Sequence, residues 1–271
     1  QNATAFEMKS TSVDGQTVAQ RHAPAFQASA PTELIQDSDA KSSPANSSQV
    51  SDFDDALLSA LFKPLGDPIK GGFGAVQKFY HVQHDTVIAV KRPYAGYYTE
   101  ALFFDECMRW INIGFHPNIV TCYYVRPVNG QLSIFFEWMD GGSLENIIQN
   151  KSLYAGTQQE VLKRILDISI QFARGLKFIH QNNQMHRDVK PDNLLLDRAG
   201  NAKVTDLGLA QALNAKRLSA QHSSQTSVTK SGVACTIKYA SPEQLDGQEP
   251  TEKTDIWSFA VSLVEMFTGH T

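Results

Sequence analysis

The sequence predicts a fold of the α+β class, with strand patterns first and long helical patterns after them. Two short apolar runs, VIAVK at 87–91 and LSIFFEWM at 132–139, are typical of buried strands. Between residues 160 and 180, apolar side chains recur every three or four positions, which is the period of an amphipathic helix. We therefore expect a sheet followed by a helical scaffold.

Size and charge restrict the classes of protein that fit. With 271 residues, 42% of them hydrophobic and 10% aromatic, the chain can form two domains or one two-lobed domain, as in a globular enzyme. The formal net charge of −4, without a basic tract or stripe, gives no electrostatic case for binding nucleic acid or a membrane surface.

Cysteine usage and hydropathy favour a reducing, cytoplasmic location. Cys107, Cys122 and Cys235 are odd in number and widely spaced, which fits free thiols better than a disulfide framework. The sequence has neither an apolar run of about 18 residues nor a signal-peptide pattern. Its first residue is Gln, so a targeting segment upstream would not be visible here.

Residues 1–51 are expected to be disordered, and the folded domain to span 52–271. The first segment is rich in Ser, Ala, Gln, Thr and Asn and shows no period of two or 3.6. A regulatory tail with phosphorylated serines is the alternative. From Asp52 onward, apolar residues can share one face of a short helix: Phe53, Leu57, Leu58 and Leu61.

The octapeptide HRDVKPDN at 186–193 concentrates the groups that could carry chemistry. Asp188 can orient and deprotonate a hydroxyl, and Lys190 can hold a transferring phosphate. Asn193 can offer an amide oxygen to a magnesium ion, and Asp206, thirteen residues later, supplies a second hard oxygen ligand. An accidental polar turn would explain an isolated Asp near an Asn, but not the further motifs described below.

This spacing resembles the catalytic loop and metal-binding motif of eukaryotic-type protein kinases. The resemblance covers residues 65–271 and implies a two-lobed kinase fold, with a strand-rich small lobe at about 62–139 and a mainly helical large lobe at 140–271. In DIWSF at 255–259, it implies that Asp255 bonds the backbone of the catalytic loop. In the family, further helices wrap the helix that begins there, so we expect a large lobe that is incomplete beyond Thr271.

The segment LGDPIKGGFGAV at 65–76 resembles the glycine-rich loop that covers the ATP phosphates. Gly71, Gly74 and Val76 match the second glycine, third glycine and valine of that pattern. Ile69 replaces the first glycine, which is expected to stiffen the loop and lower nucleotide affinity. An ordinary Gly-rich hairpin turn is the alternative. The loop residues assigned to the nucleotide are Ile69, Lys70, Gly71, Gly72, Phe73, Gly74 and Val76.

Lys91, at the end of VIAVK, resembles the kinase lysine that pairs with the α and β phosphates; a solvated strand-end lysine is the alternative. The helix expected at 99–112 presents Glu106 on its apolar face, so Glu106 is assigned as the partner of Lys91. Asp105 is a less favoured partner because it lies about 100° around the helix. In HPNIV at 116–120, His116 is expected to be structural.

The strand at 132–139 resembles the one that leads into the kinase hinge. Phe136 would guard the back of the nucleotide pocket, and the backbone from Glu137 to Met139 would bond the adenine. Ala89 and Leu195 are assigned to the same pocket. Taken alone, these residues also fit an ordinary buried strand with a Gly-rich turn.

Downstream motifs extend the resemblance. Leu207 replaces the commoner Phe of the metal motif but is expected to pack as an apolar plug. The polar segment 211–232 matches an activation loop, phosphorylated by an activating kinase or by the enzyme itself, with Arg187 pairing with a phosphate on Ser231 or Thr229. In CTIKYASPEQ at 235–244, the resemblance implies that Thr236 bonds both Asp188 and Lys190.

The resemblance implies a protein serine/threonine kinase that uses ATP and Mg²⁺ and acts on a Ser or Thr of a protein substrate. The catalytic residues assigned are Asp188, Lys190, Asn193 and Thr236, and the metal ligands are Asn193 and Asp206. A catalytically inactive pseudokinase or binding module is the alternative, and the intact set of motifs argues against it. A small-molecule kinase of related fold is disfavoured by the docking segment at 236–243.

Overall fold

The computed structural model describes residues 60–71, 74–94, 100–128, 130–207, 227–228 and 234–270. Side chains at 100–103, 105–106, 227–228 and 234–235 lie outside this description. The predicted disordered segment and most of the predicted activation loop lie outside it too. All described residues belong to one compact unit of the chain, residues 41–271.

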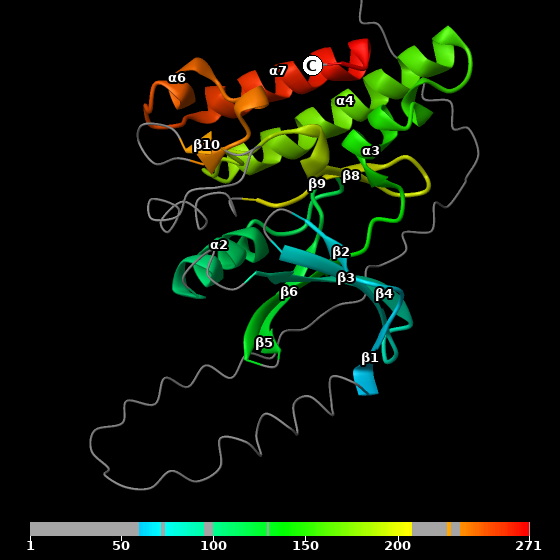
Figure 1. Cartoon of the computed structure of the whole chain (residues 1–271), viewed down its shortest axis with the longest axis vertical. Coiled ribbons are helices and arrows are strands. Elements are labelled where there is room, and N and C mark those ends of the chain that lie inside the picture. The colour runs from blue at the N-terminus through cyan, green and yellow to red at the C-terminus, as the bar shows by residue number, and fades with distance from the viewer. Residues whose placement is uncertain are drawn as a thin grey trace, which may run out of the picture. The chain divides into compact units, whose positions relative to one another are not determined.

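The first half of the described region is an antiparallel sheet with one helix beside it (Figure 1). The strands run in the order β1-β3-β4-β6-β5, and β2 pairs with β3. Their bounds are β1 (Phe62–Pro64), β2 (Ile69–Lys70), β3 (Gly74–His81), β4 (Thr86–Pro93), β5 (Cys122–Val128) and β6 (Gln131–Glu137). Helix α2 (Glu100–Asn112) packs against β5. The expected strands at 87–91 and 132–139 and the expected helix at 99–112 are confirmed within two residues.

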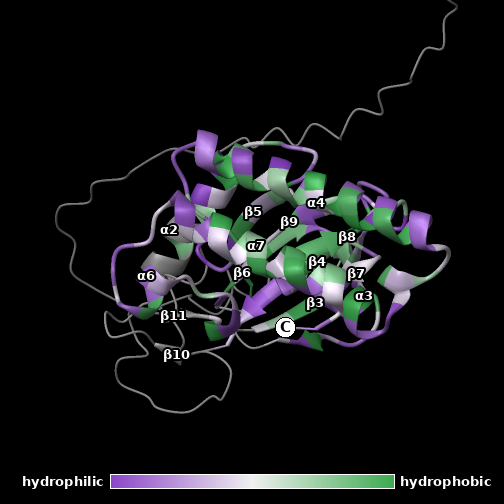
Figure 2. Ribbon diagram, turned by 90° about the horizontal axis from the view of Figure 1, so that it is seen from above, coloured by the Kyte–Doolittle hydropathy of each residue, from purple (hydrophilic) through white to green (hydrophobic). Residues whose placement is uncertain are grey.

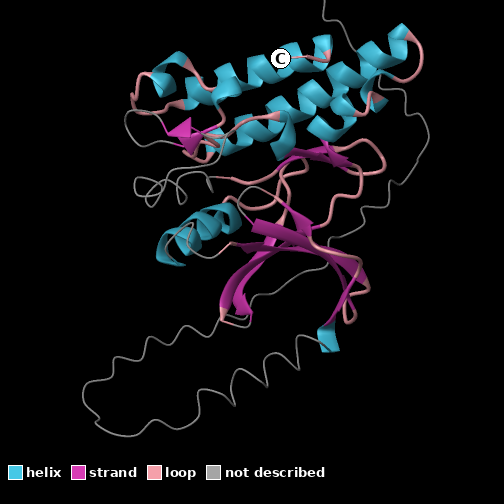
Figure 3. Cartoon of the chain, in the orientation of Figure 1, coloured by secondary structure: helices cyan, strands magenta, loops and turns pink. Residues whose placement is uncertain are grey.

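The second half is mainly helical and carries two small sheets, as Figure 3 shows. The helices are α3 (Leu144–Gln149), α4 (Gln158–Gln181), α6 (Pro242–Leu245) and α7 (Glu252–Thr268), with 3₁₀ turns η1 (Ser152–Tyr154), η2 (Pro191–Asn193) and η3 (Ile237–Tyr239). One sheet contains β7 (Gly142–Ser143), β8 (Leu194–Leu196) and β9 (Ala202–Val204). The other pairs β10 (Ser227–Val228) with β11 (Ala234–Cys235).

Helix α4 is the scaffold that its sequence predicts. Thr157 and Glu160 form a capping box at its start, which satisfies backbone N–H groups that have no partner within the helix. Its buried side chains follow the predicted stripe: Ile165, Ile168, Phe172, Leu176 and Ile179. Each such side chain contributes about 1.5 to 3 kcal/mol when fully buried. At Gly175 an added Cβ would lie 2.6 Å from the Asn118 carbonyl oxygen, so the helix can approach the 118–120 segment closely.

Helix α7 packs antiparallel to α4 with a polar buried face. Its buried residues are Thr254, Asp255, Ser258, Ser262, Glu265 and Met266. Four large apolar side chains of this helix are about half exposed in the described chain: Ile256, Trp257, Val264 and Phe267. Figure 2 looks onto both helices, with apolar positions visible along α7.

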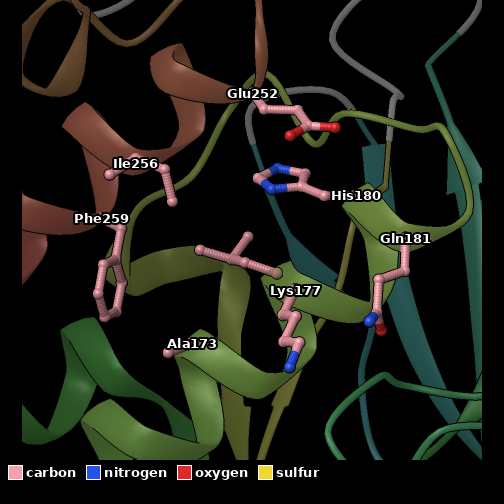
Figure 4. Close-up of a pocket in the computed structure, with 8 residues that line it drawn as sticks. Ala173, Lys177, His180, Gln181, Glu252, Ile256 and Phe259 are labelled. Atoms are coloured by element: carbon pink, nitrogen blue, oxygen red, sulfur yellow. The ribbon is translucent and has the colours of Figure 1, made fainter.

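A groove of about 490 Å³ separates the two helices at one end. Figure 4 shows Ala173 and Lys177 of α4 on one side and Ile256 and Phe259 of α7 on the other. It is lined by the helical scaffold and not by the residues predicted to carry chemistry.

Two further expectations can be checked in the described chain. Cys107 and Cys122 are buried and outside any disulfide, as predicted, whereas the side chain of Cys235 lies outside the described residues. Among the helices that the structure describes, none combines the length and the apolar character needed to cross a bilayer.

Candidate active site

The backbone of the predicted catalytic loop is held by a carboxylate from α7. Asp255 accepts hydrogen bonds from the N–H groups of His186 at 2.8 Å and Arg187 at 2.7 Å, and its Oδ2 lies 2.8 Å from His180 Nε2. Only 1% of Asp255 is exposed, so these groups replace the water that the buried charge loses. The predicted bond from Asp255 to this loop is confirmed.

Two residues at the site adopt left-handed backbone conformations. Arg187 has φ of 69° and Asp206 has φ of 60°, values that side chains with a Cβ adopt rarely. His186 joins the two segments, because its Nε2 lies 2.8 Å from the carbonyl oxygen of Thr205. The same histidine is fully buried. Packing and hydrogen bonds therefore hold the uncommon backbone geometry beside Asp188 and Asp206.

Asp188, Lys190 and Thr236 form a closed group of hydrogen bonds. Lys190 Nζ donates to Asp188 Oδ2 at 2.7 Å and to Thr236 Oγ1 at 3.0 Å, and Thr236 Oγ1 donates to Asp188 Oδ1 at 3.0 Å. The residues come from the loop before η2 and from the cap of η3, so the chain must bring together positions 48 residues apart. The contacts predicted for Thr236 are confirmed.

The charge state of Asp188 results from two opposing effects. Burial alone would raise the pKa of this carboxyl, but Lys190, with help from His186 and the Thr236 hydroxyl, outweighs it and lowers the pKa below its usual value. Asp188 is therefore an ionised hydrogen-bond acceptor at neutral pH. That is the state required of a group that accepts a proton.

Asn193 and Asp206 offer oxygens suited to a hard cation. The Asn193 side-chain nitrogen donates to the Asp188 carbonyl oxygen at 2.8 Å and to Asp188 Oδ2 at 3.2 Å, which leaves its Oδ1 as an acceptor. Magnesium is commonly held by one or two protein oxygens together with phosphates, so this donor set fits it. Within the described chain, no cluster of three or more His, Cys, Asp or Glu forms a metal site made of protein alone.

Lys91 binds Asp206 directly. Its Nζ lies 2.7 Å from both carboxylate oxygens, and the two side chains are 12% and 27% exposed. This contact joins β4 of the first sheet to the segment after β9, although the two residues are 115 positions apart in the sequence. The predicted ion pair of Lys91 with Glu106, and the alternative with Asp105, cannot be placed, because both acidic side chains lie outside the described residues.

The predicted phosphate loop is a tight hairpin between β2 and β3. Ile69 pairs with Val76 across it, and the Gly71 N–H donates to the Gly74 carbonyl oxygen at 2.8 Å. A Cβ at Gly74 would lie 2.5 Å from the Arg92 carbonyl oxygen, so this position requires glycine. Ile69 is 61% exposed. Lys70 is also exposed, and Gly72 and Phe73 lie outside the described residues.

The residues predicted to bind the adenine lie in β4, in β8 and at the end of β6. Ala89 of β4 pairs with Phe136, and both are buried. Among the described residues, the backbone N–H and carbonyl of Met139 form no hydrogen bond, and the residue is buried. Leu195 lies in β8, paired with Ser143 and Lys203. Buried Leu207 packs in the core cluster, as predicted.

The structural role expected for His116 is confirmed, whereas several ion pairs were not predicted. His116 Nδ1 accepts from the Asn118 N–H at 3.1 Å, and its ring stacks on Phe178, which is a structural role. Besides Lys91 with Asp206, the unpredicted pairs include Lys203 with Glu137 at 2.5 Å and Lys238 with Glu265 at 2.8 Å. Each joins ordinary charged residue types far apart in the chain, and no local pattern marks them.

Glu265 belongs to a buried polar cluster beside the catalytic group. Tyr239 donates to Glu265 Oε2 at 2.6 Å, and burial together with this bond raises the pKa of the tyrosine. Tyr239 is therefore a neutral donor at neutral pH. It fixes the η3 turn, whose N-cap is Thr236, against α7.

Comparisons with known proteins agree with this geometry. The protein kinase domain family matches residues 62–271. A probable LRR receptor-like serine/threonine-protein kinase of Arabidopsis thaliana is 39% identical over 157 residues, 57% of this chain and 13% of that protein. Serine/threonine-protein kinase PrkC of Bacillus subtilis is 37% identical over 155 residues, 57% of this chain and 22% of that protein.

A third relative is mitogen-activated protein kinase kinase 1 of Arabidopsis thaliana, 36% identical over 155 residues, 56% of this chain and 39% of that protein. The chain therefore spans between about a tenth and two fifths of the curated relatives it matches.

Proposed function

Because the chain belongs to the protein kinase domain family, we propose that it transfers the γ-phosphate of ATP to a Ser or Thr hydroxyl of a protein substrate. The observation that carries this proposal is the group formed by Asp188, Lys190 and Thr236, with all three contacts between 2.7 and 3.0 Å. Relatives that bear the name serine/threonine-protein kinase support the choice of acceptor. A cytoplasmic site of action is part of the proposal.

In this proposal each side chain has a defined task. Asp188 accepts the proton of the acceptor hydroxyl, because it is ionised and its side chain, which is 14% exposed, retains some contact with solvent beside Lys190. Lys190 stabilises negative charge on the transferred group. The Thr236 hydroxyl bonds both the Asp188 carboxylate and the Lys190 ammonium and so fixes their relative positions. Lys91 holds the nucleotide phosphates.

Asn193 and Asp206 would hold magnesium, which neutralises phosphate charge when bound. The backbone of Met139 would bond the adenine, and Ala89 would line the adenine pocket. The hairpin from Ile69 to Val76 would cover the phosphates with backbone N–H groups.

Regulation through the segment 211–232 is part of the same proposal. Arg187 directly precedes Asp188 and adopts the left-handed conformation given above, so ordering of its guanidinium by a phosphate would act next to the base. Ser231 and Thr229 are the proposed sites, modified by another kinase or by the enzyme itself. Mass spectrometry of active enzyme, with the Ser231→Ala and Thr229→Ala variants, tests this.

The test of the function is a pair of substitutions that separate chemistry from nucleotide binding. Asp188→Asn keeps the shape but removes the base, and should lower phosphate transfer by roughly two to four orders of magnitude while Mg-ATP binding stays nearly unchanged. Asp206→Asn should also weaken Mg-ATP binding. Transfer is measured on mixed protein extracts and on small hydroxyl compounds, and binding by calorimetry.

The possible results distinguish the candidates. Wild-type turnover from either variant would contradict the assignment. Phosphorylation of small hydroxyl compounds alone would favour a small-molecule kinase. Nucleotide binding without any transfer by the wild-type protein would favour an inactive binding module.

A further inference from the structure

The side chain of Glu137 connects the two sheets of the site. Glu137 is the last residue of β6, and its Oε1 lies 2.5 Å from Nζ of Lys203 in β9. Its Oε2 accepts a hydrogen bond from the Thr121 N–H at 3.2 Å. Both carboxylate oxygens are therefore engaged, one by the three-stranded sheet and one by the segment before β5.

The groups around this ion pair form a closed ring of contacts. The Glu137 N–H donates to the Thr121 carbonyl oxygen at 2.9 Å. The 118–120 segment is also bonded to β9: the Val204 N–H donates to the Asn118 carbonyl oxygen at 2.9 Å, and the Val120 N–H donates to the Val204 carbonyl oxygen at 2.8 Å. The end of β6, the 118–121 segment and β9 are thus mutually fixed, and the Glu137–Lys203 pair completes the ring.

Burial makes this pair stronger than an ordinary surface contact. The side chains of Lys203 and Glu137 are only 13% and 26% exposed. Exposed pairs are commonly worth less than about 1 kcal/mol, because water screens them, and partial burial reduces that screening. Lys203 also lies in β9, whose backbone pairs with β8 and is held at Ala202 by the Gln171 side chain, so the main chain that carries the lysine is already fixed.

Lys203 and Glu137 each lie close in the sequence to a residue proposed to bind the nucleotide. Lys203 precedes Asp206 by three residues on the same segment, and Glu137 precedes Met139 by two. We propose that Glu137 and Lys203 are positioning residues that hold the adenine-binding end of β6 in a fixed relation to Asp206. This inference rests on the proposed function, because it requires one nucleotide to contact both ends.

The test compares two ligands that differ in how much of the site they span. Mg-ATP reaches both ends, whereas adenosine reaches only the β6 end. Lys203→Met, which keeps the length of the stem, should weaken Mg-ATP binding about three- to tenfold and adenosine binding by less than about twofold. The turnover at saturating ATP should change by less than about twofold, because the bound complex restores the geometry.

Matched variants control for unspecific effects. Lys163→Met removes one lysine from the exposed surface of α4 and should leave both affinities unchanged. Reversing the pair with Glu137→Lys and Lys203→Glu together restores the attraction but not the hydrogen bond from the Thr121 N–H, so it should recover part of the Mg-ATP affinity that Lys203→Met loses. Thermal unfolding of each variant shows whether the fold is intact.

Three results would overturn the proposal. Equal weakening of both ligands by Lys203→Met would show a role in the fold of the pocket alone. Unchanged Mg-ATP affinity in Lys203→Met would show that the ion pair does not couple the two ends. If the wild-type protein binds adenosine but not Mg-ATP, or neither, the proposed function itself fails, and this inference fails with it.

Discussion

The predicted catalytic loop and the predicted phosphate hairpin are built differently. Around the loop, polar groups are buried and paired: Asp255 is 1% exposed, His186 is fully buried and Asn193 is 7% exposed. Across the hairpin, Ile69 is 61% exposed, and backbone pairing between β2 and β3 sets the geometry. Buried side chains set the geometry of the loop, and backbone pairing sets the geometry of the hairpin.

This difference predicts unequal sensitivity to substitution. Removing one partner from a buried charged network leaves other groups desolvated and unpaired, which costs several kcal/mol. Exposed positions away from such networks usually change stability by less than about 0.5 kcal/mol. Substitutions around Asp255 should therefore disturb fold and activity together, whereas substitutions in the hairpin should act on nucleotide affinity.

The largest effect is expected from Asp255→Ala. The N–H groups of His186 and Arg187 and the ring of His180 would lose their acceptor, and the left-handed turn at Arg187 would lose its support. We expect the free energy of unfolding to fall by about 3 to 5 kcal/mol, with phosphate transfer abolished. Urea unfolding measures the first and a transfer assay the second.

Glu249→Ala is the matched control, because it removes an exposed carboxylate near the start of the same helix. It should change the free energy of unfolding by less than about 0.5 kcal/mol. A similar loss in both variants would contradict the distinction between buried and exposed charges.

A smaller effect, with a pH signature, is expected from Lys190→Met. Lys190 is the main group that lowers the pKa of Asp188 against the opposing effect of burial. Its removal raises that pKa, so Asp188 becomes protonated at a higher pH and the acidic limb of the kcat/KM profile moves upward. Transfer at the optimum should also fall by roughly 100-fold, because a charge-stabilising donor is lost.

Lys238→Met is the comparison for this prediction. Lys238 also pairs with a buried carboxylate, Glu265, but does not contact Asp188. The acidic limb of the kcat/KM profile of Lys238→Met should lie at the same pH as that of the wild-type protein. An unmoved limb in Lys190→Met would show that another group sets the profile.

The sequence predicted contacts of the 186–193 loop better than those of its surroundings, for a physical reason. Asp188, Lys190 and Asn193 lie within six residues, so the local turn alone brings them together. The ion pair between Glu137 and Lys203 joins residues 66 positions apart, and only the folded sheets make them neighbours.

The buried face of a helix was predictable where its apolar residues recur with a regular period. The stripe on α4 was predicted correctly because nearly every buried position in it is apolar. On α7 the buried face is polar, from Thr254 to Glu265, so hydropathy alone would place the wrong side inward. Asp255 was found only because the family resemblance assigned it a role.

The smallest effect is expected from Ile69→Gly, which tests the hairpin side of the comparison. Ile69 forms β2 with Lys70 and pairs with Val76, and a β-branched residue there restricts the backbone. Glycine should let the hairpin follow a bound phosphate more closely and raise Mg-ATP affinity about two- to fivefold. The same freedom costs about 0.5 to 1 kcal/mol of strand stability, so the melting temperature should fall slightly while affinity rises.

Ile69→Val keeps the β-branch and should match the wild-type protein in both measurements, titration of Mg-ATP and thermal unfolding. Weaker Mg-ATP binding by Ile69→Gly would mean that the isoleucine side chain itself contacts the nucleotide. The hairpin would then depend on a side chain, as the catalytic loop does, and the contrast between the two regions would be wrong.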